Sequence, residues 1–400
     1  MKLMGQQHTE PLQTALIKAG LEDVAVVQGN NSLNITYSNN LYRSETRALA
    51  EVIYMVSDYT DLNSSVNILI TRKNIGILAI SLKSAILKSF LNNSLSLEEL
   101  ISASIFSMDV DLITLFFADV PKQNKSNLKF DVPVGLGVRY LLGAFDYPVR
   151  IAVDFLPSVA VDLSKGLYAN AQFAVPIYND LDRNNFVRPS LLTLTQDIAL
   201  KQNVYTSVTA GCFSRNRAGV HATVKKYFLE ECFAVGIDLG YTSYTSFTGK
   251  VDFLSREDQN YSDYAVAVDY RLRKYDLNIE ASYGRFLYQD EGFMVDVTRT
   301  FGETSIGFFA LTTTSGSNAG FKFSIAIPPG KYTKHKIVRI RPDSDFTLSY
   351  RVVGGDRLGR TYLTGNNLIN KLADYYPSFI TKDLKNYLIP YNANKLIETN

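Results

Sequence analysis

The stretch CFAVGIDLGYT, residues 232–242, shows most clearly how this chain folds. Small or charged residues alternate there with large apolar ones, which are Phe233, Val235, Ile237, Leu239 and Tyr241. Successive side chains of a β-strand point to opposite faces. The stretch therefore predicts a strand with one apolar face and one polar face.

The same alternation recurs from about residue 129 to residue 352. Pro157 interrupts the alternation, so residues 158–163 are interpreted either as a short extra strand or as an extension of the strand before them. About 12–14 strands are therefore expected. The predicted strands are 129–141, 148–156, 166–177, 190–200, 203–213, 219–229, 232–243, 261–272, 275–287, 292–300, 303–314, 319–328 and 345–352.

These strands favour a closed barrel whose apolar face meets lipid. Many strands are ten or more residues long, and the sequence offers no second apolar layer to cover them. Short connections such as Arg273-Lys274 alternate with long ones such as Ser243–Asn260, as in membrane barrels. A large soluble β-sandwich or solenoid is the alternative, because alternation alone does not identify what covers the apolar face.

In a barrel, the polar faces of the strands would line a hydrated interior of mixed charge. No single position stands out as a binding site. The residues predicted to line this interior are Arg139, Arg150, Asp154, Gln172, Asp197, Lys225, Asp238, Asp269, Arg271, Glu280, Asp296, Glu303, Lys322 and Arg351.

Residues 1–106 have a different pattern and predict a small α+β domain. Helices are expected near 10–19, 43–57 and 83–106, and hairpin strands at 23–28 with 32–38 and at 65–71 with 75–82. Asp109–Asp119 is predicted as a first strand leading into the sheet. The fold class is therefore mainly β, with an α+β domain (1–106), a transmembrane antiparallel barrel (107–352) and a tail (353–400). The tail is helix-like at Leu368–Tyr376 and is expected to be a plug or a periplasmic segment.

Composition restricts the class of protein further. The apolar fraction is 46% and the net charge is +2, so neither disorder nor a general affinity for nucleic acid is expected. The 25 Tyr, which suit membrane–water interfaces, occur in a chain without Trp. No run reaches the ~18 apolar residues of a transmembrane helix. Export to an outer membrane requires a leader, yet Met1–His8 lacks the apolar segment of a signal peptide.

The sequence gives little support for catalysis. His8, His221 and His335 are the only histidines, and none stands in a nucleophile or metal motif, so no catalytic residue, metal or cofactor is expected. His221 should line the interior in contact with water. Asp269 and Glu280, on adjacent strands with the same orientation, are the one pair that resembles the two carboxylates of a glycosidase. An ion-paired network is the simpler interpretation, because Arg271 and Lys322 face the same way.

Several motifs resemble the YjbH family of outer-membrane proteins encoded in exopolysaccharide and capsule gene clusters. These motifs are GRFLYQDEG (284–292), DVTRTFG (296–302), IGFFA (306–310), GFKFSIAIPP (320–329) with the basic segment 331–341, SYR (349–351), TAGCF (209–213) with Gly219, and YRSE (42–45). The chain is short for this family, so the resemblance does not predict how wide a pore would be.

The resemblance implies a non-enzymatic protein of the bacterial cell outer membrane that assists polysaccharide secretion. Its partners would be the polysaccharide, outer-membrane lipid and periplasmic or other envelope proteins of an export system, without nucleic acid. Three other functions stay open at this point: a general porin or small-solute channel, an outer-membrane enzyme that modifies polysaccharide, and a soluble structural or adhesive β-protein.

Overall fold

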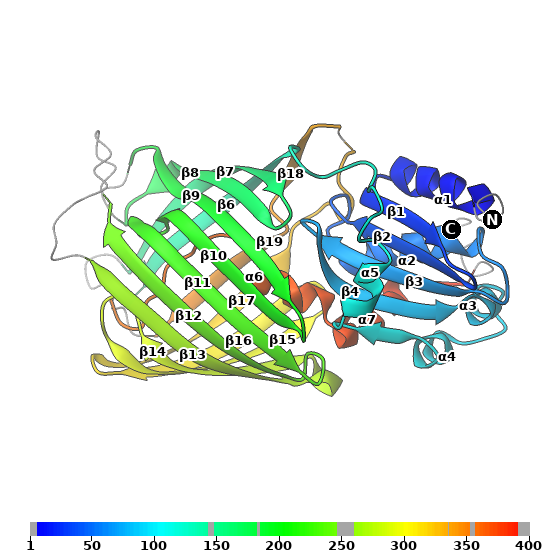
Figure 1. Ribbon diagram of the computed structural model, residues 1–400. Coiled ribbons are helices and arrows are strands. Elements are labelled where there is room, and N and C mark those ends of the chain that lie inside the picture. Colours follow the sequence, from blue (N-terminus) through cyan, green and yellow to red (C-terminus); the bar gives the residue numbers. More distant parts are fainter. Residues whose placement is uncertain are drawn as a thin grey trace.

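The computed structural model describes residues 6–142, 148–181, 185–245, 260–334, 336–352 and 357–390, with side chains from residue 9 onward. Two sheets dominate it. A five-stranded sheet with helices lies beside one end of a larger, strongly curved sheet of 14 strands (Figure 1). We call the first unit the N-terminal module, and the two ends of the large sheet the module end and the far end.

The N-terminal module is an α+β unit with its own apolar core. Its sheet has the order β1-β2-β3-β4-β5, and β2 pairs in parallel with β3. Its elements are α1 (Gln6–Ala19), β1 (Glu22–Gln28), β2 (Ser32–Ser38), α2 (Glu45–Ser57), β3 (Ser65–Arg72), β4 (Ile75–Lys83), α3 (Ser84–Leu91), α4 (Leu97–Ser102), β5 (Ile105–Ser107) and α5 (Asp111–Leu115).

Local sequence signals explain most of these elements. The Ser44 side chain accepts a hydrogen bond from the Arg47 amide and begins α2, and Ser96 with Glu99 forms a reciprocal capping box on α4. Two predictions were wrong. The helix expected over 83–106 is divided into α3 and α4 and is followed by strand β5, which pairs with β4. The strand expected at Asp109–Asp119 is instead the short helix α5.

The large sheet is an antiparallel meander of long strands, with β18 and β19 added at its two edges. The order is β18-β6-β7-β8-β9-β10-β11-β12-β13-β14-β15-β16-β17-β19. Its strands are β6 (Phe130–Leu142), β7 (Val149–Ser164), β8 (Leu167–Asn179), β9 (Arg188–Leu200), β10 (Val204–Phe213), β11 (Arg217–Phe228), β12 (Phe233–Tyr244), β13 (Tyr261–Leu272), β14 (Leu277–Arg285), β15 (Glu291–Phe301), β16 (Thr304–Thr313), β17 (Gly316–Ala326), β18 (Val338–Pro342) and β19 (Asp345–Arg351).

The mainly β architecture is confirmed, and every strand expected between 129 and 352 is present. The segment 158–163 extends β7 beyond Pro157. The basic segment 331–341 was not among the predicted strands, but its second half forms most of β18. Val338 and Ile340 alternate there with Arg339 and Arg341, and the strand pairs in parallel with β6.

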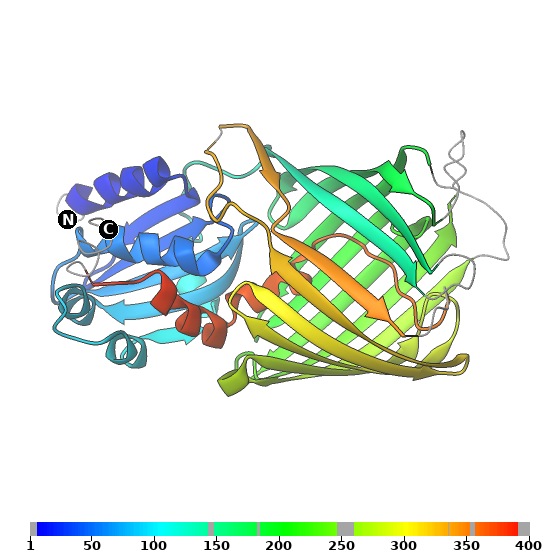
Figure 2. The same ribbon diagram turned by 180° about the vertical axis from the view of Figure 1, so that it is seen from behind.

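The two edges of the large sheet approach each other. Figure 2 shows the sheet bending round so that β19 comes near the first strands. The Tyr140 hydroxyl on β6 donates to the Ser349 carbonyl on β19 at 3.0 Å, and the Asp343 amide donates to the Val134 carbonyl at 3.0 Å. Within the described residues no strand ladder joins β6 to β19, so the sheet is curved but not closed.

The C-terminal segment (residues 357–390) runs inside the curved sheet and back toward the N-terminal module (Figure 2). It contains α6 (Leu368–Lys371), η3 (Leu372–Tyr375), α7 (Pro377–Asp383) and η4 (Leu384–Asn386). Leu368, Leu372 and Ile380 are buried in one apolar cluster with residues of the N-terminal module. None of the helices in the described ranges is long and apolar enough to cross a bilayer.

Candidate functional site

The large sheet has an exposed apolar face and a buried charged face. On β13, Val266 and Tyr270 point outward and are 47% and 50% exposed, whereas Asp269 and Arg271 point inward and are 7% and 4% exposed. The same pattern holds on other strands, where outward Leu239 is exposed. A water-soluble protein buries its apolar side chains and exposes its charges. This sheet does the opposite, and we call its polar side the inner face.

The inner face carries clusters of paired charges that follow from strand register. Asp154 on β7 lies 3.4 Å from Arg139 and 2.9 Å from Arg188, which come from β6 and β9. Gln172, from the neighbouring strand β8, donates to the Ser158 hydroxyl at 3.0 Å. Arg150 shares a strand and a face with Asp154. Two guanidinium groups thus converge on one oxygen of the buried Asp154 carboxylate.

A second cluster contains the two carboxylates that resembled a glycosidase pair. The register places Glu280 opposite Asp269 on one side and opposite Asp296 on the other. Lys225 lies 2.9 Å from Asp269, and Lys322 lies 2.7 Å from Asp296. Three carboxylates therefore lie side by side on β13, β14 and β15, and Lys225 and Lys322 pair with the two outer ones.

The C-terminal segment contacts the large sheet at points between residues 358 and 382. At the far end, Arg351 donates to the carbonyls of Leu358 and Gly359 at 2.8 and 3.2 Å. Midway, Asp197 accepts a hydrogen bond from the Leu368 amide at 3.1 Å and so holds the start of α6. The segment thus occupies part of the space that the curved sheet encloses.

At the module end the segment is anchored more firmly. Arg271 donates to the Ser378 hydroxyl at 3.2 Å, and its guanidinium lies over the Tyr376 ring at 5.0 Å. The Tyr376 hydroxyl donates to that of Tyr227 at 3.3 Å. Lys382 pairs with Asp276 in the β13–β14 connection at 2.8 Å.

Glu303 differs from the other predicted residues. It lies in the turn between β15 and β16, at the rim of the sheet, and pairs with Arg43 of the N-terminal module at 2.7 Å. A second rim contact joins Lys73 to Asp162 at 2.7 Å. The predicted interior residue Glu303 is thus a docking contact between the two units.

The remaining predicted residue, Asp238, belongs to a cluster of polar and aromatic side chains on the inner face. The sequence predicted only some members of this cluster. Asp238 accepts a hydrogen bond from Thr223 at 2.5 Å and lies 3.4 Å from His221. His221 was expected to contact water, but its Nδ1 lies 3.1 Å from the hydroxyl of Tyr362 in the C-terminal segment. Tyr362 carried no sequence signal, because its stretch lacks any periodicity. His335, the basic-segment histidine, lies outside the described residues, as does the His8 side chain.

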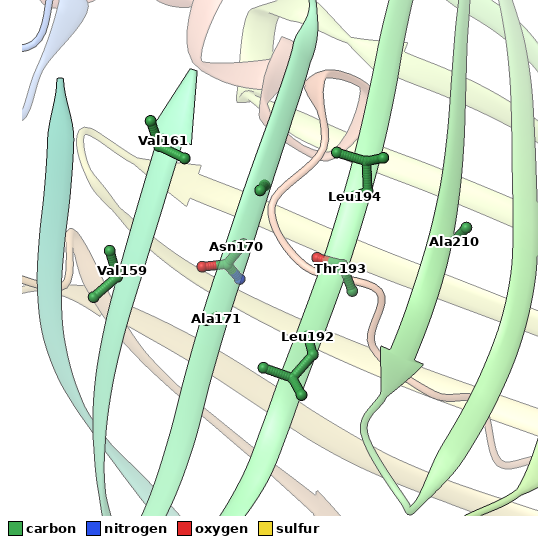
Figure 3. Close-up of a pocket in the computed structure, with 9 residues that line it drawn as sticks. Val159, Val161, Asn170, Ala171, Leu192, Thr193, Leu194 and Ala210 are labelled. Atoms are coloured by element: carbon green, nitrogen blue, oxygen red, sulfur yellow. The ribbon is translucent and has the colours of Figure 1, made fainter. Parts of the chain in front are cut away.

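A shallow groove of about 420 Å³ lies on the opposite, apolar side of the sheet (Figure 3). Its lining is mainly apolar and includes the outward residues Val159 and Leu194 and the small residues Ala169 and Ala171, together with the polar residues Asn170 and Thr193. The groove is a shallow depression in the apolar face.

The fold and the inner face define a class: a mainly β protein with a long-stranded curved sheet, apolar outside and charged inside. Residues 183–334 match the model of the YjbH family, described as exopolysaccharide biosynthesis protein YbjH. The predicted resemblance is confirmed over this range, which is less than half of the 400 residues. A search of curated proteins returned no match for this chain.

Proposed function

We propose that the protein is a β-barrel of the bacterial outer membrane that assists exopolysaccharide or capsule secretion. The observation that carries the proposal is the exposed apolar outer face on strands that match an exopolysaccharide family over residues 183–334. Bulky side chains such as Phe308 and Phe293, 65% and 61% exposed, need a cover, and lipid tails supply one.

Closure of the sheet is supported by the path of one short stretch. β18 pairs with β6, and β19, only Asp343 and Ser344 later, pairs with β17. Residues 338–351 thus act as one composite strand that touches both edges of a twelve-strand meander (β6–β17). Such a strand runs parallel to β6, so the barrel would have a parallel seam there. Closing the seam satisfies the edge groups that lipid cannot satisfy.

The connections suggest an orientation in the membrane. Turns at the module end are short, such as 201–203 and 273–276, whereas far-end connections include 180–187 and 245–260. Membrane barrels have short periplasmic turns and longer outer loops. The N-terminal module would then lie in the periplasm, where it can meet other envelope proteins of an export system.

The charged inner face would provide many weak contacts to a hydrated polymer. Mixed charges commonly tune passage through a barrel. The C-terminal segment lies in this space, which disfavours a permanently open porin and favours a conduit that opens during secretion. Conductance in planar bilayers separates the two functions: the wild-type protein should show little open current, whereas a general porin would show a large and steady one.

The main test is genetic. A strain that lacks the protein should lose surface polysaccharide and accumulate the polymer in the periplasm, and wild-type protein should restore secretion. Unchanged surface polysaccharide in the deletion strain would exclude the proposal.

We propose a non-enzymatic role for Asp269 and Glu280, because Lys225 and Lys322 pair with this carboxylate cluster. Complementation by Asp269→Asn together with Glu280→Gln separates this role from catalysis. Secretion is expected to persist with the double variant if it is as abundant in the membrane as wild type. Loss of secretion at wild-type abundance would favour an enzyme.

A further inference from the structure

Tyr362 occupies a well-defined site on the inner face at the far end of the large sheet. Its ring stacks on that of Phe213, with centroids 5.3 Å apart and planes inclined by 7°. The His221 ring meets it edge-on, at 5.6 Å and 84°. Phe213 is only 2% exposed while the tyrosine covers it.

The hydroxyl of Tyr362 is held as closely as its ring. It lies 3.1 Å from His221 Nδ1 and donates toward Asp263, whose carboxylate oxygens are 3.1 and 3.2 Å away. Strand register brings these groups together, because Gly240 on β12 pairs with His221 on one side and with Asp263 on the other.

Gly240 leaves the space that the Tyr362 hydroxyl fills, because it has no side chain. A Cβ atom placed there would lie 2.0 Å from the Tyr362 hydroxyl oxygen, so only glycine leaves room for a group in this position. The site therefore combines a flat aromatic wall, a carboxylate, an imidazole and a floor without a side chain.

We propose that this site binds a neutral hexopyranose unit of the polymer, and that Tyr362 occupies it when the conduit is closed. The inference rests on the proposed function. An aromatic face suits the apolar C–H face of a pyranose ring, and a carboxylate accepts hydrogen bonds from sugar hydroxyls. Asp263 and the nearby Asp238 disfavour uronic acids, which would bring a like charge.

The segment around Tyr362 can leave without unfolding the molecule. Residues 361–366 form neither helix nor strand, and their backbone contacts to the wall include the Ser214 hydroxyl, which accepts from the Leu363 amide at 2.7 Å. The helices that follow are anchored separately in the apolar core shared with the N-terminal module. Sugar and tyrosine therefore compete for one site, and each lowers the apparent affinity of the other.

Binding can be measured on full-length protein in detergent micelles with maltohexaose as the probe. Tyr362→Ala should raise the affinity for maltohexaose about tenfold or more over wild type, because the competitor is removed. Adding Asp263→Asn to this variant should abolish the gain. Tyr362→Phe keeps the stacked ring but loses the hydroxyl contacts to Asp263 and His221, so its affinity should lie between those of wild type and Tyr362→Ala. Equal affinity of the wild type and Tyr362→Ala for maltohexaose would overturn the proposal.

A second variant guards against misfolding of the first. The chain has no Trp, so Tyr362→Trp introduces a single indole at the site. Its emission should move to longer wavelength as maltohexaose displaces it into water, and an emission unchanged by saturating maltohexaose would contradict the inference. Both measurements use purified protein. Their failure would leave the secretion phenotype of the deletion strain intact, whereas failure of the proposed function would show in that phenotype.

Discussion

Arg43 and Glu303 join the N-terminal module to the rim of the large sheet through two parallel hydrogen bonds. Arg43 Nε lies 2.8 Å from Glu303 Oε1, and Arg43 Nη2 lies 2.7 Å from Oε2. The same guanidinium donates to the Ile327 carbonyl at 2.6 Å. A bidentate pair of this kind fixes orientation as well as distance.

Replacing Arg43 should therefore loosen the module. Arg43→Ala leaves Glu303 without its partner at a largely buried position, and we expect a loss of about 1–2 kcal/mol in the free energy of unfolding. Urea unfolding and limited proteolysis between residues 117 and 130 measure it. Lys201→Ala, an exposed basic residue at the same rim, is the control and should have no effect. Equal proteolysis rates for both variants would argue against a docking role.

The attachment of β18 to β6 depends on another arginine. Arg339 forms two hydrogen bonds of 2.8 Å with Asp131 and contacts Glu22 at 2.5 Å, and it is only 6% exposed. Arg339→Met should cost about 1.5–3 kcal/mol, because Glu22 and Asp131 lose charged hydrogen bonds and keep only Lys129 and Arg341 as cationic partners. Arg339→Lys should cost less, since it keeps the charge and loses the fork geometry. Similar unfolding midpoints for wild type and Arg339→Met would refute this role.

Glu45 should make the N-terminal module sensitive to pH. Burial raises the pKa of Glu45 from 4.5 to about 7, although the Tyr37 hydroxyl donates to its carboxylate at 3.0 Å. Between these two values the folded state holds a proton that the unfolded state has lost. The contribution of Glu45 to stability is therefore greatest below pH 4.5 and declines as the pH rises to about 7.

The loss of stability from this group is on the order of 3 kcal/mol. Urea unfolding at acid and alkaline pH, followed by tyrosine fluorescence, measures it. Glu45→Gln should remove most of this decline, whereas Glu51→Gln on the same helix should leave it in place. A decline of the same size in Glu45→Gln would rule out Glu45 as its source.

Because the outer face is apolar, placing a charged side chain there should lower the stability of the protein in a bilayer. Val266 lies midway along β13, and Val266→Lys should cost about 2–4 kcal/mol in a bilayer. Leu112→Lys is the matched control: Leu112 is 80% exposed on α5, outside the sheet, and the change should be nearly neutral. Unfolding in lipid vesicles compares them, and equal small effects would indicate that water covers both sites.

Sequence alone predicted the strands well because alternation is a local signal. It failed where tertiary contacts decide the structure. Ile113 in α5 and Phe117, just after the end of this helix, bury their side chains in one cluster with Leu69, and these tertiary contacts favour a short helix over the predicted strand. β18 was not predicted, because its arginines find their partner, Asp131, only on a strand that is distant in sequence.

The candidate site was predictable only in part. Alternation placed Asp238 and Asp269 on the polar faces, and register then explains their neighbours. The contribution of Tyr362 could not be foreseen, since its partners Phe213 and Asp263 are remote in sequence and nothing local marks it. Likewise, the alternation predicted that Glu303 would line the interior. Glu303 lies instead in a turn, where it pairs with Arg43 of the N-terminal module.

The central claim is that lipid covers the outer face of the large sheet. Its most direct test places a bimane fluorophore on a cysteine at Val266 or at Ala267, in protein whose free Cys212 and Cys232 are replaced by alanine, and adds lipids with spin labels on their acyl chains. Strong quenching at position 266 and weak quenching at position 267 is the predicted result. Weak quenching at 266, with ready quenching by iodide from water, would contradict the account.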